Sequence, residues 1–65
     1  MTNAIEMANE IRNRASRFIS RKLAFQCAAH AVKTLWVILG DDGRFWVVRP
    51  VDAMRLEKMG YEFAN

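Results

Sequence analysis

The chain has 65 residues, 52% of them hydrophobic and 26% charged, with a formal net charge of +3. This composition is typical of a folded globular domain and excludes a disordered segment, and the length predicts a single domain over residues 1–65. A domain this small buries only about 60% of the surface that its unfolded chain exposes, so we expect it to gain stability as a homodimer.

The small numbers of cysteine and histidine residues, and the absence of a long apolar stretch, exclude several classes of protein. Cys27 is the only cysteine and His30 the only histidine, which excludes an intramolecular disulfide and the usual four-ligand zinc site. The chain does not start with a basic segment followed by an apolar run. Its longest apolar stretch, residues 35–39, is far shorter than the roughly 20 residues that span a bilayer. We therefore expect a cytoplasmic protein without metal or membrane contact.

The first half of the chain is predicted to be helical, because no Gly or Pro precedes Gly40. A single helix from Asn3 to Lys33 would be about 46 Å long, too long for a compact domain of this size. We therefore expect a break between Ser16 and Ser20, with Ser20 as the N-cap of the second helix.

The two predicted helices differ in their apolar faces. In the first helix, Arg12 points into an otherwise apolar face. In the second, only Lys22, Gln26 and Lys33 form a narrow polar stripe, which predicts a helix that is nearly all core and lies closely on a sheet. Its broad apolar face consists of Leu23, Ala24, Phe25, Cys27, Ala28, Ala31 and Val32.

Residues 35–39 and 45–49 are β-branched and aromatic runs that flank Asp42-Gly43, which predicts a β-hairpin with Gly43 at positive φ. A two-residue turn would pair Leu39 with Trp46, whereas a three-residue turn that ends in a Gly43 bulge would pair Leu39 with Phe45. The sequence does not distinguish the two registers.

Both faces of this hairpin are apolar in either register. A two-stranded ribbon has at most one dry face in water unless something covers the second. Three kinds of cover are open: helices of the same chain on both sides, a second copy, or a foreign partner.

The hairpin is followed by a short predicted helix. Pro50 suits the first helical position, Asp52 falls in the first turn, where negative charge is favoured, and Gly60 is a natural stop. Residues 61–63 fit a brief edge strand but are too few to establish one. The predicted fold is a small single α+β domain with two N-terminal helices, a β-hairpin and a short C-terminal helix.

A search for catalytic groups finds no glycine-rich phosphate loop, no His-Glu-x-x-His motif and no nucleophile elbow. Cys27 and His30 are expected to be a structural thiol and a histidine at the edge of a helix. Asp41 and Asp42 are expected to serve the turn, where aspartate hydrogen-bonds its own backbone. We therefore expect neither enzyme activity nor a cofactor.

The strongest electrostatic feature is a window without any acidic residue that contains Arg12, Arg14, Arg17, Arg21 and Lys22. If residues 12–22 were helical, Arg14, Arg17 and Arg21 would form one stripe. Such a stripe meets the carboxylates of an acidic protein, the phosphates of a nucleic acid, or only solvent, and these alternatives remain open.

The function predicted from these features is that of a non-catalytic protein-interaction module that self-associates and binds a partner with an acidic surface. The alternative is a nucleic-acid-binding protein that adds stacking on the hairpin aromatics to its basic stripe. In size and lack of catalytic motifs the chain is similar to small accessory proteins of phages and mobile elements that inhibit host machines, a similarity that assigns no residue. The predicted contact residues are Arg14, Arg17, Arg21, Lys22, Arg44, Trp36 and Trp46.

Overall fold

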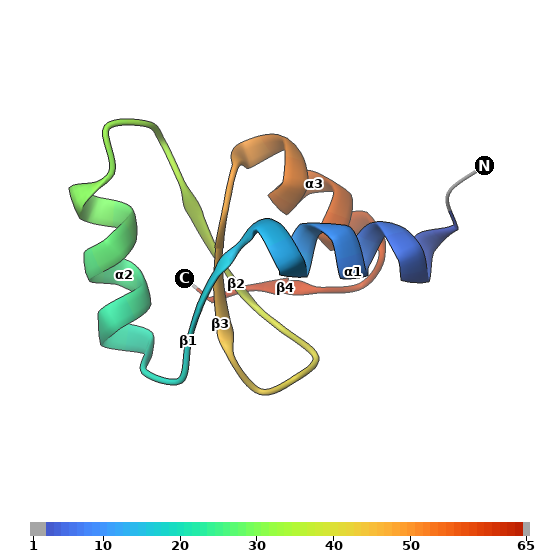
Figure 1. Ribbon diagram of the computed structural model, residues 1–65, viewed down its shortest axis with the longest axis horizontal. Coiled ribbons are helices and arrows are strands. Elements are labelled where there is room, and N and C mark those ends of the chain that lie inside the picture. Colours follow the sequence, from blue (N-terminus) through green and yellow to red (C-terminus); the bar gives the residue numbers. More distant parts are fainter. Residues whose placement is uncertain (1–2, 65) are drawn as a thin grey trace.

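The computed structural model describes residues 3–64, which form three helices and one four-stranded sheet (Figure 1). The α+β fold is confirmed, and its five predicted elements occur in the predicted order. Two short strands are added, one in the expected break and one at the end. The elements are α1 (Ala4–Arg14), β1 (Ser16–Phe18), α2 (Arg21–His30), β2 (Trp36–Leu39), β3 (Phe45–Val48), α3 (Pro50–Lys58) and β4 (Glu62–Phe63).

The two N-terminal helices are separated where the sequence predicts it. The side chain of Asn3 caps α1 by accepting the Glu6 N–H at 2.8 Å, and the Ser20 hydroxyl caps α2 by accepting the Leu23 N–H at 3.3 Å. Each cap satisfies a backbone donor that has no partner within its helix. Arg12 is half-buried, as the pattern of α1 predicts.

The sheet is antiparallel throughout, with strand order β1-β3-β2-β4. Leu39 lies opposite Phe45, so the hairpin has the register of the three-residue turn. The turn is closed by a hydrogen bond of 2.8 Å from the Gly40 N–H to the Arg44 carbonyl, and Gly43 has a φ of 78°. The predicted positive φ is confirmed, and the structure selects one of the two registers that the sequence left open.

Helices of the same chain cover both faces of the hairpin, with α2 on one side and α1 and α3 on the other (Figure 1). On the α2 side, Ala24 packs against Val37 and Val47. On the opposite side, the core consists of Ala8, Ile11, Ile38, Trp46, Val48, Ala53 and Leu56. The first of the three kinds of cover is therefore the one observed, and a bare sheet face no longer argues for a homodimer.

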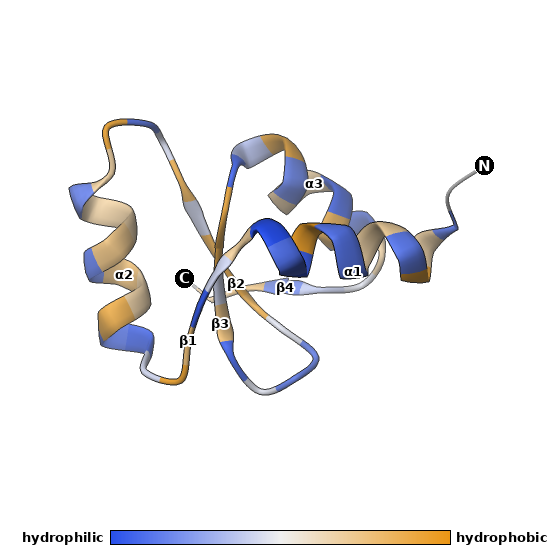
Figure 2. Ribbon diagram, viewed as in Figure 1, coloured by the Kyte–Doolittle hydropathy of each residue, from blue (hydrophilic) through white to orange (hydrophobic). Residues whose placement is uncertain are grey.

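The prediction that α2 is nearly all core is wrong. Ala24 is its only buried residue, Leu23 is 52% exposed, and Val32 lies fully exposed just after the helix. Hydrophobic and hydrophilic residues alternate along α2 (Figure 2). The physical reason is that α2 packs on the sheet from one side only, and no other described element covers its outer side.

The C-terminal part of the chain follows the sequence prediction closely. Pro50 begins α3, Asp52 lies in its first turn, and Gly60 follows the helix with a φ of 99°. Strand β4 then pairs with β2, so the brief edge strand that residues 61–63 suggested is formed over Glu62–Phe63. Within residues 3–64, no helix combines the length and the apolar character needed to cross a membrane. The expectation about the start of the chain also concerns Met1 and Thr2, which lie outside the described residues.

Candidate functional site

The basic residues singled out from the sequence do not form a helical stripe. Arg14 is the last residue of α1, Arg17 lies in β1, and Arg21 is the first residue of α2. The strand between the helices interrupts the periodicity on which the stripe depended. Lys22 is exposed on α2, and Arg44 is exposed in the hairpin turn between β2 and β3.

Two of these arginines have partners within the chain. Arg21 donates from Nη2 to the Ala64 carbonyl oxygen at 2.8 Å, and its guanidinium lies 4.8 Å from the centroid of the Phe25 ring. Arg14 donates from Nη2 to Oδ1 of Asp52 at 3.3 Å. Arg21 thus links Ala64 to α2. Arg14 instead contacts Asp52, which lies in α3.

The two tryptophans occupy very different environments. Trp46 is only 1% exposed, and its indole N–H donates to Oδ1 of Asp42 at 3.0 Å, so it is a core residue and cannot contact a partner directly. Trp36 is 39% exposed and meets Phe63 edge-on, with 5.7 Å between ring centroids. Of the two predicted contact tryptophans, only Trp36 reaches the surface.

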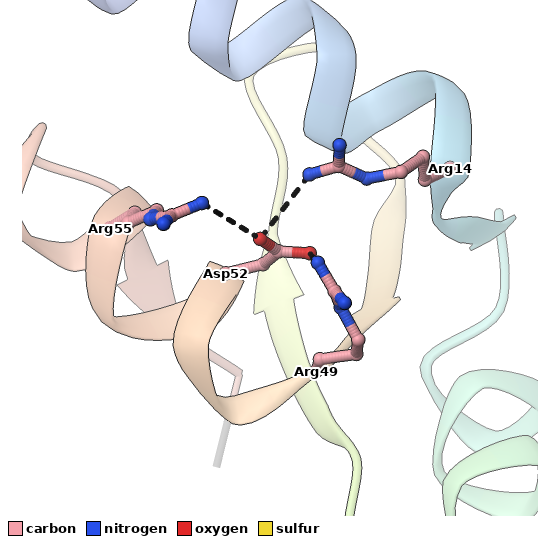
Figure 3. Close-up of polar contacts among 4 residues, drawn as sticks. All are labelled: Arg14, Arg49, Asp52 and Arg55. Carbon is pink, nitrogen blue, oxygen red and sulfur yellow. Dashed lines mark hydrogen bonds and ion pairs between the residues drawn. The ribbon is translucent and has the colours of Figure 1, made fainter.

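Three arginines converge on the carboxylate of Asp52, and we call Arg14, Arg49 and Arg55 the arginine cluster (Figure 3). The nitrogen-to-oxygen distances are 3.3 Å from Arg14, 3.2 Å from Arg49 and 3.8 Å from Arg55. The Asp52 side chain is 4% exposed, whereas those of the arginines are 51%, 58% and 49% exposed. A buried anion thus holds three cations that face the solvent.

The charges of this cluster do not cancel. Three guanidinium groups and one carboxylate leave two positive charges at the surface. Each guanidinium offers five N–H donors, while a carboxylate accepts about four hydrogen bonds, so most of the donors remain available. Because Asp52 already orients the arginines, an external anion binds them at a lower cost in side-chain entropy.

A hollow of about 340 Å³ lies beside the arginine cluster. Arg14, Arg49 and Asp52 form its polar rim together with Ser16. The hollow lies at the start of β1, where Ser16 pairs with Val47. Val48, the next residue of β3, has no partner in β1. The rest of the wall of the hollow is apolar and consists of Ile11, Ala15, Leu35, Val47 and Val48.

Part of this site carries a local signal in the sequence. Arg49 and Arg55 each lie three residues from Asp52, which is the spacing of neighbours on one side of a helix. Asp52 also favours the positive N-terminal end of α3. Arg14, however, is 38 residues away in sequence, and only the packing of α1 beside α3 brings it to Asp52. The position of Asp52 in the first turn of α3 was therefore predictable from the sequence, whereas its three arginine partners were not predicted.

The groups considered for catalysis have structural environments. Asp42 accepts hydrogen bonds from the Arg44 N–H and from the Trp46 indole, both at 3.0 Å, as expected for a turn aspartate. Burial acts to raise the pKa of Asp42, but these hydrogen bonds and the Arg44 charge outweigh it and hold the pKa below its usual value. Burial and the neighbouring Asp41 carboxylate raise the pKa of Tyr61. Within residues 3–64, no group of three or more His, Cys, Asp or Glu side chains could hold a metal ion.

Comparison with family models, with curated proteins and with solved structures found no match for this chain. The geometry of the arginine cluster and of the adjoining hollow is therefore the basis on which a function is proposed.

Proposed function

We propose that this protein is a non-catalytic binding module that attaches to an acidic protein surface through the arginine cluster. The observation that supports this most directly is the sharing of one buried carboxylate by three half-exposed arginines. Guanidinium groups bind carboxylates through paired N–H donors, and they are weakly hydrated, which makes them suited to interfaces. The partner's carboxylates would compensate the two excess positive charges.

Such a module acts by occupying a surface. By covering an acidic functional region of a larger assembly, it would inhibit or regulate that assembly without chemistry of its own. The accessory proteins of phages and mobile elements, with which the chain shares its size class, supply one biological setting for this proposal.

The second candidate is a nucleic-acid-binding protein, and one observation favours it. Residues 11–40 contain six Lys or Arg residues and no Asp or Glu, and this segment includes all of β1, α2 and β2. Exposed basic residues such as Lys22 and Lys33 would then meet phosphates. The affinity of such a complex would fall steeply with salt, because each neutralised phosphate releases counterions.

A pair of variants with equal charge separates the two candidates. Arg14→Gln with Arg55→Gln removes two positive charges from the arginine cluster and leaves Arg49 on Asp52. Lys22→Gln with Lys33→Gln removes two from exposed positions elsewhere. Fluorescence anisotropy would measure the binding of three labelled probes: a peptide rich in glutamate, a single-stranded oligothymidine and a DNA duplex.

We expect the peptide to bind the parent chain, and the cluster variant to lose about tenfold or more in affinity, the effect of about 1.4 kcal/mol. The lysine variant should lose less than about twofold, as exposed charges distant from the contact do. Preferential binding of either DNA probe, weakened equally by both variants and steeply by salt, would contradict the acidic-protein proposal and support the nucleic-acid candidate. Absence of binding to all three probes would contradict both.

A further inference from the structure

We infer that the ligand of the arginine cluster is an acidic peptide segment that also inserts a large apolar side chain into the adjoining hollow. This inference rests on the proposed function and specifies the chemistry of the partner. Two of the arginines, Arg14 and Arg49, both contact Asp52 and line the hollow. A carboxylate bound to either guanidinium therefore brings the neighbouring side chains of the ligand to the mouth of the hollow.

The wall of the hollow favours an aliphatic group. Ala15 and Leu35 are partly exposed and supply most of the apolar surface that a ligand can reach, whereas Ile11 and Val47 are only 1% and 5% exposed. Removing apolar surface from water is favourable in proportion to its area, so a leucine-sized side chain placed here gains affinity. The combination of an apolar wall and a cationic rim matches a ligand in which an apolar side chain is flanked by carboxylates.

The same wall is poorly suited to a nucleic acid. Single-stranded nucleic acids bind proteins by stacking their bases on aromatic rings above a basic groove. The residues that line this hollow include no aromatic side chain. The exposed aromatic residue Trp36 lies outside this lining. A peptide is therefore the occupant that the hollow favours.

Two labelled peptides of equal charge test the inference. Glu-Glu-Leu-Glu-Glu carries an apolar side chain between its carboxylates, and Glu-Glu-Gly-Glu-Glu lacks it. We expect the leucine peptide to bind about tenfold more tightly, a difference of about 1.4 kcal/mol that is within the gain from burying one leucine. Both peptides should lose affinity in the variant with Arg14→Gln and Arg55→Gln.

A variant that fills the hollow provides the second arm. Ser16→Trp places an indole at the rim from an exposed strand position, where an aromatic residue suits the backbone. It should abolish the preference for the leucine peptide, so that the two peptides bind with equal affinity. Gln26→Trp, at an exposed position of α2, is the matched control and should retain the preference.

NMR of the parent chain gives a result that does not depend on how any variant folds. The leucine peptide should shift the methyl signals of Ile11, Leu35 and Val47, while the glycine peptide should leave them in place. Equal affinity for both peptides, still dependent on the arginine cluster, would overturn this inference and leave the proposed function standing. Binding of neither peptide would overturn both. Shifts of these methyl signals by oligothymidine in place of the leucine peptide would assign the hollow to a nucleic acid.

Discussion

Gly40 and Gly43 lie in the same hairpin turn, but each is required for a different physical reason. Gly43 has a φ of 78°, and a Cβ at this position would meet no atom within 4 Å, so its constraint is purely conformational. Gly40 is buried, and a Cβ there would collide with the indole ring of Trp46, so its constraint is steric. The first constraint is predictable from the Asp-Gly turn signal, while the second depends on the packing of the Trp46 side chain, six residues away.

Substitutions at the two glycines should therefore destabilise the fold in different ways. Gly43→Val should lower the free energy of unfolding by more than about 1 kcal/mol through backbone strain, with Trp46 undisturbed. Gly40→Ala should lower it by about 1–3 kcal/mol and displace the indole, which shifts tryptophan fluorescence. Urea denaturation followed by fluorescence measures both effects. Unchanged stability in Gly43→Val would contradict the turn, and an undisturbed Trp46 in Gly40→Ala would contradict the close approach.

Asp42 gives the turn a dependence on pH. Because its folded-state pKa is lower than the usual value of 3.8, the ionised carboxylate stabilises the fold above that value. This contribution is lost as the pH falls through the folded-state pKa. The thermal midpoint of Asp42→Ala should therefore lie below that of the parent chain at neutral pH, and the gap should narrow in acid. A gap that keeps the same size as the pH falls well below 3.8 would contradict this role.

At the scale of elements, local signals in the sequence account for most of the fold. Caps, turn residues and periodicity located α1, α2, the hairpin and α3, because each signal acts within a few residues. Strand β1 was missed since Ser16–Phe18 is short and its pairing with β3 is a contact between distant segments. The burial of α2 was overestimated because an apolar helix face does not reveal whether anything covers it. The contact of Arg14 with Asp52 was missed because the two residues are far apart in the sequence, as β1 and β3 are.

The one-sided packing of α2 can be tested by two neighbouring substitutions. At concentrations low enough for the chain to be monomeric, Leu23→Gln, on the exposed side of the helix, should change the free energy of unfolding by no more than about 0.5 kcal/mol. Ala24→Leu, at a fully buried position against Val37 and Val47, should cost about 1–3 kcal/mol by overpacking. Equal effects of the two substitutions in chemical denaturation would contradict the observed orientation of the helix.

At the scale of the whole molecule, we propose that the chain self-associates through exposed apolar residues of α2 and of the segments that flank it. Ile19, Leu23 and Val32 are 77%, 52% and 102% exposed, and a domain of this size gains stability by burying such groups against a second copy. Light scattering at several concentrations should show a dimer at micromolar concentration, and Leu23→Gln with Val32→Gln should shift it towards the monomer. A monomeric mass at every concentration would contradict this proposal and leave the arginine cluster unaffected.

The arginine cluster is the contact surface that we propose, and NMR of the arginine side-chain Nε–H signals tests this role most directly. Titration with the Glu-Glu-Leu-Glu-Glu peptide should shift the signals of Arg14, Arg49 and Arg55 in a saturable manner. Those of Arg17, exposed in β1, and of Arg44, exposed in the hairpin turn, should stay in place. Saturable shifts at Arg17 or Arg44 with the cluster unchanged would contradict the claim that Asp52 and its three arginines form the contact surface.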